Sequence, residues 1–289
     1  MDGHGLNILT FDLEDWFHVL DHLGVEDPAS WPHYPSRVEE NTRRILDLLD
    51  AKGKKATFFC LGWVAEKYPN LIMDIVGRGH ELGTHSYFHQ LVYRQSRSDF
   101  REDVLRSKST LENIAGQEII AYRAPGFSVT PETPWVFDEL VEAGFKYDCS
   151  IFPMQRAHGG FPGLPSMPFI LERAGGEIII LPMNTFRFFG QNIVFSGGGY
   201  FRLFNYQLIR FMMLRSEYVM TYFHPRDFDA NQPMIPGLSM TRRFKSFVGL
   251  RGALSKLDML LEEFEFQSLK SAVIQLDMLQ LPRLKLFLH

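Results

Sequence analysis

Short apolar runs alternate with amphipathic helical stretches along most of this chain. The expected strands cover residues 6–11, 56–61, 80–84, 119–122, 145–149 and 218–223. The expected helices cover residues 38–49, 64–76, 99–114, 131–143, 206–214 and 254–264. Strands that alternate with helices are typical of a parallel sheet or barrel that is covered by helices. The pattern therefore predicts an α/β fold.

The rhythm changes in a region rich in Gly and Pro at about residues 153–199, with brief expected strands at 177–181 and 193–195. This region resembles an insertion or a set of long loops over one face, where binding residues tend to concentrate. No internal repeat, low-complexity tract or linker divides the chain. We expect residues 1–289 to form a single catalytic domain with a loop-rich insertion and a helical C-terminal segment.

Composition excludes some classes of function. The net charge of −4 argues against a general nucleic-acid binder, which normally carries a strongly basic patch or total. We see no signal peptide, and no window approaches the ~20 apolar residues of a membrane span. Cys60 and Cys149 lie in apolar stretches without metal-type spacing and are expected to be buried thiols. Together these features favour a cytoplasmic protein, either free or at the inner face of the membrane.

Polar side chains stand at the ends of the expected strands. They are Asp12, Glu14 and Asp15 after the first strand, His85 and His89 after the third, Arg123 after the fourth, Asp148 at the fifth and His224 at the last. The carboxyl ends of parallel barrel strands meet at one rim, which is where such folds place their chemistry. Residues far apart in sequence would then share one pocket.

Two of these residues have a spacing that suits a metal ion. His85 and His89 are four residues apart, so both can face one point on a helical turn or in a tight loop. With one carboxylate they would form a two-histidine, one-carboxylate set that suits zinc or a similar divalent ion. The spacing alone is weak evidence, since such histidines can also be surface or capping residues, and Asp12, Glu14 and Asp15 could form a solvated turn. A buried acidic cluster would need a cation and Arg123 for compensation.

Five motifs, in this order, resemble those of the NodB-type polysaccharide deacetylases, carbohydrate esterase family 4. They are TFDLED at residues 10–15, HSYFH at 85–89, RAPGF at 123–127, YDCS at 147–150 and YFHP at 222–225. The chain is most similar to the branch associated with exopolysaccharide and O-antigen loci, including the exosortase-linked deacetylases. That branch has the Asp-x-Glu-Asp start, a GGGYFR element, here residues 197–202, and an acidic residue after the last motif, here Asp227. The resemblance implies a deformed (β/α) barrel, commonly of seven strands, with one divalent metal ion, most often Zn²⁺.

The resemblance also implies a role for each motif residue. Asp12 matches the catalytic base, His85 and His89 the metal-binding histidines, and Arg123 the arginine that orients the base. His224 matches the general acid and Asp148 the acid that steadies it. Gly126, followed by Phe127, falls where the family directs a backbone N–H toward the developing oxyanion.

The third metal ligand stays open at this point. Most members of the family have two adjacent aspartates, whereas Leu13 follows Asp12 in this chain. Glu14 shares the strand face of Asp12 by the period of two and is preferred. Asp15 remains a competitor, because the strand can end before it.

The expected reaction is hydrolysis of N-acetyl groups on the amino sugars of a polysaccharide or its lipid-linked precursor, with an acetylated glycan as the partner. One alternative is an allantoinase-like or cyclic-imide amidohydrolase of the same fold, which a closed pocket rather than an open groove would favour. The other is a non-catalytic carbohydrate-binding protein. Aromatic residues near the rim, among them Phe127, could stack on sugar faces or simply pack. His18 matches no motif position but lies close to the acidic cluster.

Overall fold

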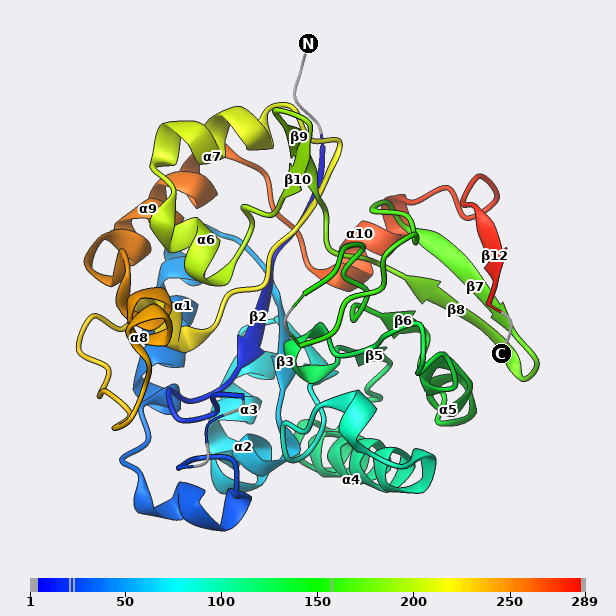
Figure 1. Ribbon diagram of the computed structural model, residues 1–289, viewed down its shortest axis with the longest axis horizontal. Coiled ribbons are helices and arrows are strands. Elements are labelled where there is room, and N and C mark those ends of the chain that lie inside the picture. Colours follow the sequence, from blue (N-terminus) through cyan, green and yellow to red (C-terminus); the bar gives the residue numbers. More distant parts are fainter. Residues whose placement is uncertain (1–4, 21, 23, 157, 287–289) are drawn as a thin grey trace.

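Parallel strands surrounded by helices form the body of the protein (Figure 1). The computed structural model describes residues 5–20, 22, 24–156 and 158–286. The strands are β1 (Leu6–Ile8), β2 (Thr10–Leu13), β3 (Thr57–Cys60), β4 (Glu81–Thr84), β5 (Ala121–Tyr122), β6 (Tyr147–Asp148), β7 (Phe169–Arg173), β8 (Gly176–Ile180), β9 (Phe186–Phe188), β10 (Gln191–Ile193), β11 (Tyr218–Met220) and β12 (Arg283–Lys285). The α-helices are α1 (Val38–Ala51), α2 (Gly62–Lys67), α3 (Pro69–Gly77), α4 (Arg97–Ala115), α5 (Val136–Glu142), α6 (Gly198–Leu203), α7 (Tyr206–Met213), α8 (Met240–Phe247), α9 (Leu250–Glu263) and α10 (Leu269–Gln275). Short 3₁₀ helices include η3 (Pro125–Phe127) and η4 (Pro225–Phe228).

The strand order is that of a (β/α) barrel. The large sheet runs β12-β7-β8-β6-β5-β4-β3-β2, and every pair from β8 to β2 is parallel. β1 leads directly into β2 and pairs in parallel with β11. In the described part of the chain, seven strand positions therefore follow one another around the barrel: β11, the β1–β2 strand, β3, β4, β5, β6 and β8. The expected fold class is confirmed.

The barrel is deformed between β8 and β11. The described residues form no strand pair there, and the segment 182–197 fills the space instead. The hydroxyl of Tyr218 donates to the carbonyl oxygen of Pro182 at 2.8 Å, and the N–H of Met220 donates to the side-chain oxygen of Asn184 at 3.1 Å. The N–H of Tyr222 donates to the carbonyl oxygen of Ser196 at 3.2 Å. Polar contacts from a loop thus replace a continuous ladder on this side.

Two expected helices differ from the structure because of proline. The helix expected at 64–76 is divided into α2 and α3 at Tyr68, since Pro69 has no N–H to continue α2 and starts α3 as its first residue. The helix expected at 131–143 begins only at Val136, after Pro134.

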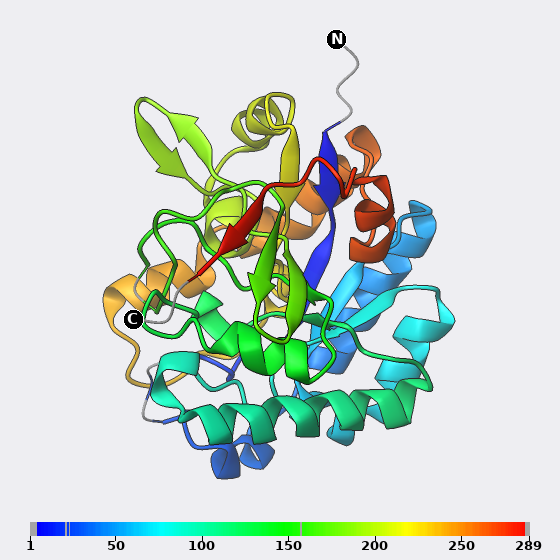
Figure 2. The same cartoon turned by 90° about the vertical axis from the view of Figure 1, so that its right-hand side faces the viewer.

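The loop-rich region also holds more regular structure than expected. β7 and β8 form an antiparallel hairpin, and β8 then joins the barrel beside β6. β12, near the C-terminus, adds to β7 in parallel, so the two distant segments lie side by side (Figure 2). Within the described ranges, no helix combines the length and the apolar character needed to cross a lipid bilayer.

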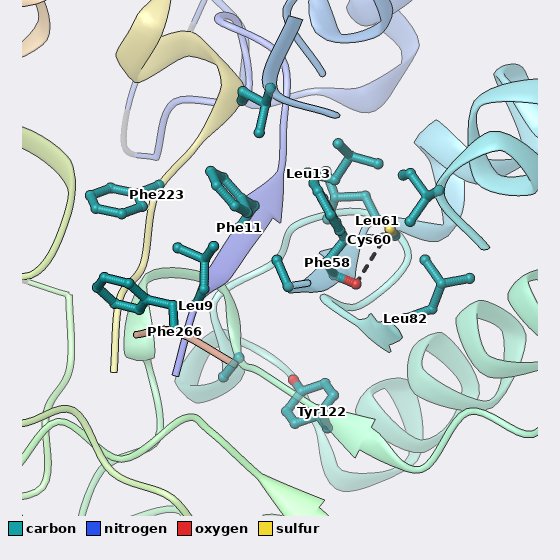
Figure 3. Packing of buried hydrophobic residues seen from close by; sticks show 14 of the residues in the cluster. Leu9, Phe11, Leu13, Phe58, Cys60, Leu61, Leu82, Tyr122, Phe223 and Phe266 are labelled. Carbon is teal, nitrogen blue, oxygen red and sulfur yellow. Dashed lines mark hydrogen bonds between the residues drawn. The ribbon is translucent and has the colours of Figure 1, made fainter. Parts of the chain in front are cut away.

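The alternation of β2 divides the barrel interior from the helical layer. Leu9, Phe11 and Leu13 belong to the main hydrophobic cluster, with Phe58 of β3 stacked on Phe11 at 5.1 Å between ring centroids (Figure 3). Side chains alternate across a strand, so Thr10 and Asp12 lie on the opposite face. This face meets the buried polar groups of the barrel interior.

We expect Phe11→Ala to lower the free energy of unfolding by about 3–5 kcal/mol, since a large buried ring would leave a cavity between β2, β3 and the segment after β11. Phe11 is fully buried and also contacts Phe223, with ring centroids 5.8 Å apart. Urea denaturation checks this. Phe189→Ala is the control, because Phe189 is 93% exposed and its loss should change the value by less than about 0.5 kcal/mol. Equal effects of the two changes would contradict the assignment of Phe11 to the core.

Candidate active site and metal centre

A buried ion pair lies at the carboxyl end of β2. Asp12 accepts a hydrogen bond of 2.6 Å at Oδ1 from Nη1 of Arg123, and the same nitrogen donates to the hydroxyl of Thr10 at 2.7 Å. Arg123 is completely buried, and its guanidinium lies 4.2 Å from the ring centroid of Phe59. The sequence expectation that Arg123 orients Asp12 agrees with this contact. The second carboxylate oxygen of Asp12 stays turned toward His224, whose Nε2 is 3.9 Å away.

Glu14, His85 and His89 converge on one point. Oε1 of Glu14 lies 3.0 Å from Nε2 of His85 and 2.9 Å from Nε2 of His89, and all three side chains are buried. The three ligand atoms are close enough to bind one metal ion together. Burial would raise the pKa of Glu14, but the imidazoles of His89, His224 and His85 hold it well below its usual range. Glu14 is therefore an ionised carboxylate that faces two imidazoles.

The hydrogen bonding of His85 fits a metal ligand. Nδ1 of His85 lies 2.7 Å from the carbonyl oxygen of Arg123, which can only accept, so Nδ1 carries the proton. In the neutral imidazole, Nε2 then presents a lone pair to the oxygen of Glu14. Two lone pairs at 3.0 Å require a cation between them, either a proton or a metal ion. Donation from the second ring nitrogen to a carbonyl is also the usual support of a metal-binding histidine.

The loop that carries the histidines is strained and firmly held. Ser86 and His89 have φ values of 68° and 55°, which non-glycine residues seldom adopt outside functional sites. The carboxylate of Asp103 on α4 accepts hydrogen bonds from the N–H groups of Tyr87 at 2.8 Å and Phe88 at 3.2 Å. The sequence left open whether the two histidines lie on one helical turn or in a tight loop. In the structure they lie in a loop.

Asp15 serves another purpose, so the interpretation of it as a possible metal ligand is wrong. Its carboxylate accepts hydrogen bonds from the N–H groups of Trp16, Arg37 and Val38 and from the hydroxyl of Ser36. These contacts cap the N-terminus of α1, where the first N–H groups have no partner within the helix. The side chain is thereby committed to α1, and Glu14 remains as the carboxylate beside the histidines.

His224 is steadied by Asp227 and not by Asp148. Nδ1 of His224 lies 2.9 Å from Oδ2 of Asp227, and the same oxygen accepts the N–H of His224 at 2.9 Å. Burial would lower the pKa of His224, but Glu14, Asp227 and Asp12 raise it to about 9. The imidazole is consequently cationic at neutral pH, with Nε2 directed toward Asp12 and Glu14 at 3.9 and 3.8 Å.

The structure therefore corrects the role that the sequence analysis expected for Asp148. Its carboxylate accepts the N–H and the hydroxyl of Ser150 at 3.0 and 2.6 Å, and Ser150 in turn accepts the N–H of Ala124 at 2.8 Å. Burial raises the pKa of Asp148 to about 7. Asp148 thus supports the loop that follows Arg123. The sequence signal that could have identified Asp227 is its position three residues after His224, within reach of the histidine backbone across one turn of η4.

The GGGYFR segment, residues 197–202, holds Asp227 in place through Arg202. Nε of Arg202 lies 3.0 Å from Oδ1 of Asp227, and both side chains are buried. A side chain at Gly197 would meet the carbonyl oxygen of Tyr222 at 2.4 Å, so only glycine lets this segment pack against the residues before His224. Arg202 also donates to the carbonyl oxygens of Lys245, Ser246 and Val248. This segment therefore ties α8 to the Asp227–His224 pair.

Gly126 and Phe127 form the opposite wall. Gly126 has a φ of 62°, and a methyl group there would lie 2.6 Å from the side chain of Leu20. Its N–H lies in the first turn of η3, where helical N–H groups have no intrahelical acceptor. Phe127 is buried, and its ring packs edge-on to Phe152 and Tyr222. The ring of Phe127 is thus a packing group, whereas the backbone at Gly126 borders the cavity.

A cavity of about 590 Å³ joins these groups. Its lining includes Asp12, Glu14, His85, His89, Gly126, Phe127 and His224. A second cavity of about 610 Å³ shares His224 and Tyr222 with it, and a third of about 280 Å³ shares His18 and His89. The expected site residues other than Asp15, Asp148 and the buried Arg123 therefore line one cavity. This cavity adjoins two neighbouring cavities with which it shares lining residues.

Two lining residues had no assigned role in the sequence analysis. His18 is buried, its Nδ1 accepts the N–H of Asp15 at 3.0 Å, and its Nε2 has no hydrogen-bond partner. Arg156 comes from the Gly- and Pro-rich region, and its guanidinium lies 4.1 Å from the ring centroid of Phe152. Neither belongs to a motif. His18 follows Asp15 by three residues, whereas the packing of a distant segment brings Arg156 to the site.

Comparison with known proteins assigns the two halves of the chain differently. The model of the polysaccharide deacetylase family matches residues 9–147, and a domain of unknown function, DUF3473, matches residues 149–274. A peptidoglycan-N-acetylglucosamine deacetylase of Bacillus cereus is 38% identical over 108 residues, which are 37% of this chain and 35% of that protein. The chain thus spans about a third of the length of this curated relative.

Solved structures extend the likeness to nearly the whole chain. A Mycobacterium smegmatis protein assigned as a polysaccharide deacetylase has a TM-score of 0.67 at 19% identity, covering 98% of this chain and 94% of that one. The PuuE allantoinase has a TM-score of 0.61 at 15% identity, covering 94% and 91%. At these identities the likeness establishes a shared fold.

We expect Glu14→Ala to remove stoichiometric zinc binding, whereas Asp15→Ala keeps it. The reason is that Oε1 of Glu14 contacts both histidines, while Asp15 caps α1. Asp15→Ala should instead lower the free energy of unfolding by about 1–2 kcal/mol, the usual cost of a lost cap. Metal analysis after dialysis against zinc and a thermal unfolding curve measure the two effects. Loss of zinc in the Asp15 variant alone would reassign the ligand.

We also expect Asp227→Asn to lower the pKa of His224 from about 9, because the removed negative charge stabilises the imidazolium. His224 would then lose its proton at lower pH than in the wild type. An NMR titration of the imidazole in metal-free protein measures the shift. Asp148→Asn is the matched control and should leave the pKa of His224 unchanged, since Asp148 bonds to Ser150. A shift in the control but not in Asp227→Asn would restore the original role of Asp148.

Proposed function

We propose that this chain, whose residues 9–147 match the polysaccharide deacetylase family, is a metal-dependent hydrolase that removes N-acetyl groups from the amino sugars of a glycan. One observation carries the proposal. Oε1 of Glu14 lies at the meeting point of His85 and His89, and Nε2 of His224 lies within 4 Å of both Glu14 and Asp12. A metal-binding set, a base and an acid thus surround one position.

The donor set supports zinc as the metal ion. Two imidazole nitrogens and one carboxylate oxygen leave coordination positions open for water and substrate, as in catalytic zinc sites. When bound there, the ion supplies Lewis acidity that favours attack of water on the amide carbonyl. We propose Glu14, His85 and His89 as its ligands.

The remaining steps follow from the side chains of the site. Asp12, held by Arg123, accepts a proton from the water molecule whose oxygen attacks the acetyl carbonyl carbon. The N–H of Gly126 donates to the developing oxyanion. As the C–N bond breaks, His224 transfers its Nε2 proton to the sugar nitrogen, giving acetate and a free amine. The raised pKa of His224, about 9, keeps that proton available at neutral pH.

The shape of the site favours a glycan over a small cyclic amide. The cavity of about 590 Å³ shares lining residues with one of about 280 Å³ and with another of about 610 Å³, so the three adjoin one another at the metal-binding set. A chain of sugars can lie along such a groove, whereas an allantoinase-like reaction needs space for one small ring. The fold shared with the PuuE allantoinase does not discriminate between these two functions. A purely carbohydrate-binding role is disfavoured, because such a protein has no need for a base, an acid and three ligands together.

The finer assignment is to exopolysaccharide or O-antigen biosynthesis. It is supported by the Asp-x-Glu-Asp start and by the GGGYFR segment. In this segment Arg202 pairs with Asp227, which holds the proposed acid His224. We further propose that residues 1–289 form one domain, because the barrel strands come from both matched regions. A cytoplasmic place, or one at the inner face of the membrane, is supported by Cys60 and Cys149, both free and buried.

We expect Asp12→Asn to reduce acetate release from an N-acetylglucosamine oligosaccharide by about 10²–10⁴-fold, the usual contribution of a general base. The variant should keep its zinc, because Asp12 bonds to Arg123 and not to His85 or His89. A coupled acetate assay and metal analysis check the two statements. Asp258→Asn on α9 is a control that should keep wild-type activity, since its side chain is 48% exposed and pairs with Lys52. Full activity in Asp12→Asn would remove Asp12 from the mechanism.

A further inference from the structure

Cationic side chains line the cavity over the metal-binding set. Arg156, Arg226, Arg242 and Lys245 border it, and Arg156, Arg226 and Lys245 also border the neighbouring cavity on the side of Tyr222 and His224. The whole chain, in contrast, has a net charge of −4. The overall charge of the chain therefore does not account for the positive lining of this site.

The carboxylates of the same lining already have partners. Asp12 is paired with Arg123, Glu14 faces His85 and His89, and Asp227 is paired with Arg202 and His224. Within the ranges that the structure describes, no carboxylate oxygen lies within 4.0 Å of the charged nitrogens of Arg156, Arg226 or Lys245. None of these three cations therefore forms a close ion pair with an acidic group of the site, although Asp227 and Glu14 act on Arg226 at longer range.

Arg156 is held in a fixed position without such a partner. Its guanidinium lies over the rings of Phe152, Phe127 and Tyr222, at 4.1, 5.3 and 5.9 Å from their centroids. Nη1 of Arg156 is buried and has no hydrogen-bond partner. A guanidinium stacked on aromatic rings keeps its N–H edge available to a carboxylate or phosphate, which it can bind through two parallel hydrogen bonds.

This guanidinium is close to the proposed acid. The ring of Tyr222, over which Arg156 lies, has its centroid 6.2 Å from that of His224. Lys245 is fixed in the same area, because its carbonyl oxygen accepts a hydrogen bond of 2.9 Å from Arg202, the partner of Asp227. Arg156 and Lys245 thus border the same cavity as His224, where an anion could lie beside the reacting sugar.

Resting on the proposed deacetylase function, we propose that the cavity beside His224 binds an anionic group of the substrate, a carboxylate or a phosphate on the sugar next to the N-acetylated one, through Arg156, Arg226 and Lys245. The substrate is then an acidic glycan or a phosphate-linked saccharide. Attraction by three cations in a partly enclosed cavity would raise the local concentration of such a substrate and weaken as salt screens it.

The test compares three N-acetylglucosamine oligosaccharides on the zinc-loaded full chain: a neutral one, one with a neighbouring uronate and one with a phosphate at the reducing end. We expect at least one anionic substrate to exceed the neutral one by about tenfold in kcat/KM, with an advantage that shrinks between 0.05 and 0.5 M salt. The two anionic arms separate a uronate from a phosphate as the source. Equal kcat/KM for all three would overturn the proposal.

Variants assign the effect to residues. Arg156→Gln should lower the ratio of anionic to neutral kcat/KM about tenfold. Lys245→Gln, which changes an exposed side chain, should lower it in the same direction even if Arg156→Gln does not fold. Arg243→Gln is the matched control, since Arg243 lies on α8 but lines neither cavity, and should keep the ratio. An unchanged ratio in Lys245→Gln and in folded Arg156→Gln would contradict the assignment.

Calorimetric titration with the same oligosaccharides separates this proposal from the proposed function. Absence of acetate release from all three substrates would argue against the deacetylase. Tighter binding of an anionic oligosaccharide than of the neutral one, lost in Lys245→Gln, would still support the anion site. Equal binding of all three would overturn it, whatever the turnover.

Discussion

The buried pair of Arg123 and Asp12 connects most of the site. Arg123 is completely buried, so its charge requires compensation, and the carboxylate of Asp12 at 2.6 Å supplies it. The backbone carbonyl of the same arginine accepts the Nδ1 proton of His85 and so turns Nε2 toward Glu14. One residue thus fixes both the orientation of the proposed base and the tautomer of a proposed ligand. Loss of either contact would leave a buried charge or lone pair without a partner.

From this pair the site extends through hydrogen-bonded supports on other elements. α4 holds the strained loop of His85 and His89 through Asp103. The GGGYFR segment holds His224 through Arg202 and Asp227, and the latter two are buried together. Residues 149–274, the matched region of unknown function, therefore contribute the proposed acid His224, its partner Asp227 and the cationic side chains of the cavity. The first half contributes the proposed base and metal ligands. We infer that neither half would form the site alone.

Much of the fold, and the grouping of side chains at the candidate site, could be predicted from the sequence. The alternation of strands and helices is a local property. Because parallel strands expose their carboxyl ends at one rim, the sequence alone predicts that Asp12, Glu14, His85, His89 and His224 lie together. Prolines limited the accuracy of the boundaries, since Pro69 divides one expected helix and Pro134 shortens another. β8 was expected only as a brief strand within a loop-rich region, because its place beside β6 depends on pairing over more than 25 residues.

The sequence by itself determined which residue types lie at the strand ends, because periodicity and motif order are written along the chain. Only the tertiary structure decided which carboxylate serves which partner. Asp15 and Glu14 are neighbours, yet one caps α1 and the other faces the histidines, since successive side chains point in different directions. Asp148 lies in a motif and Asp227 follows one, but the turn of η4 brings Asp227 to His224. The place of Arg156 over three aromatic rings likewise comes from packing between distant segments, which no local pattern records.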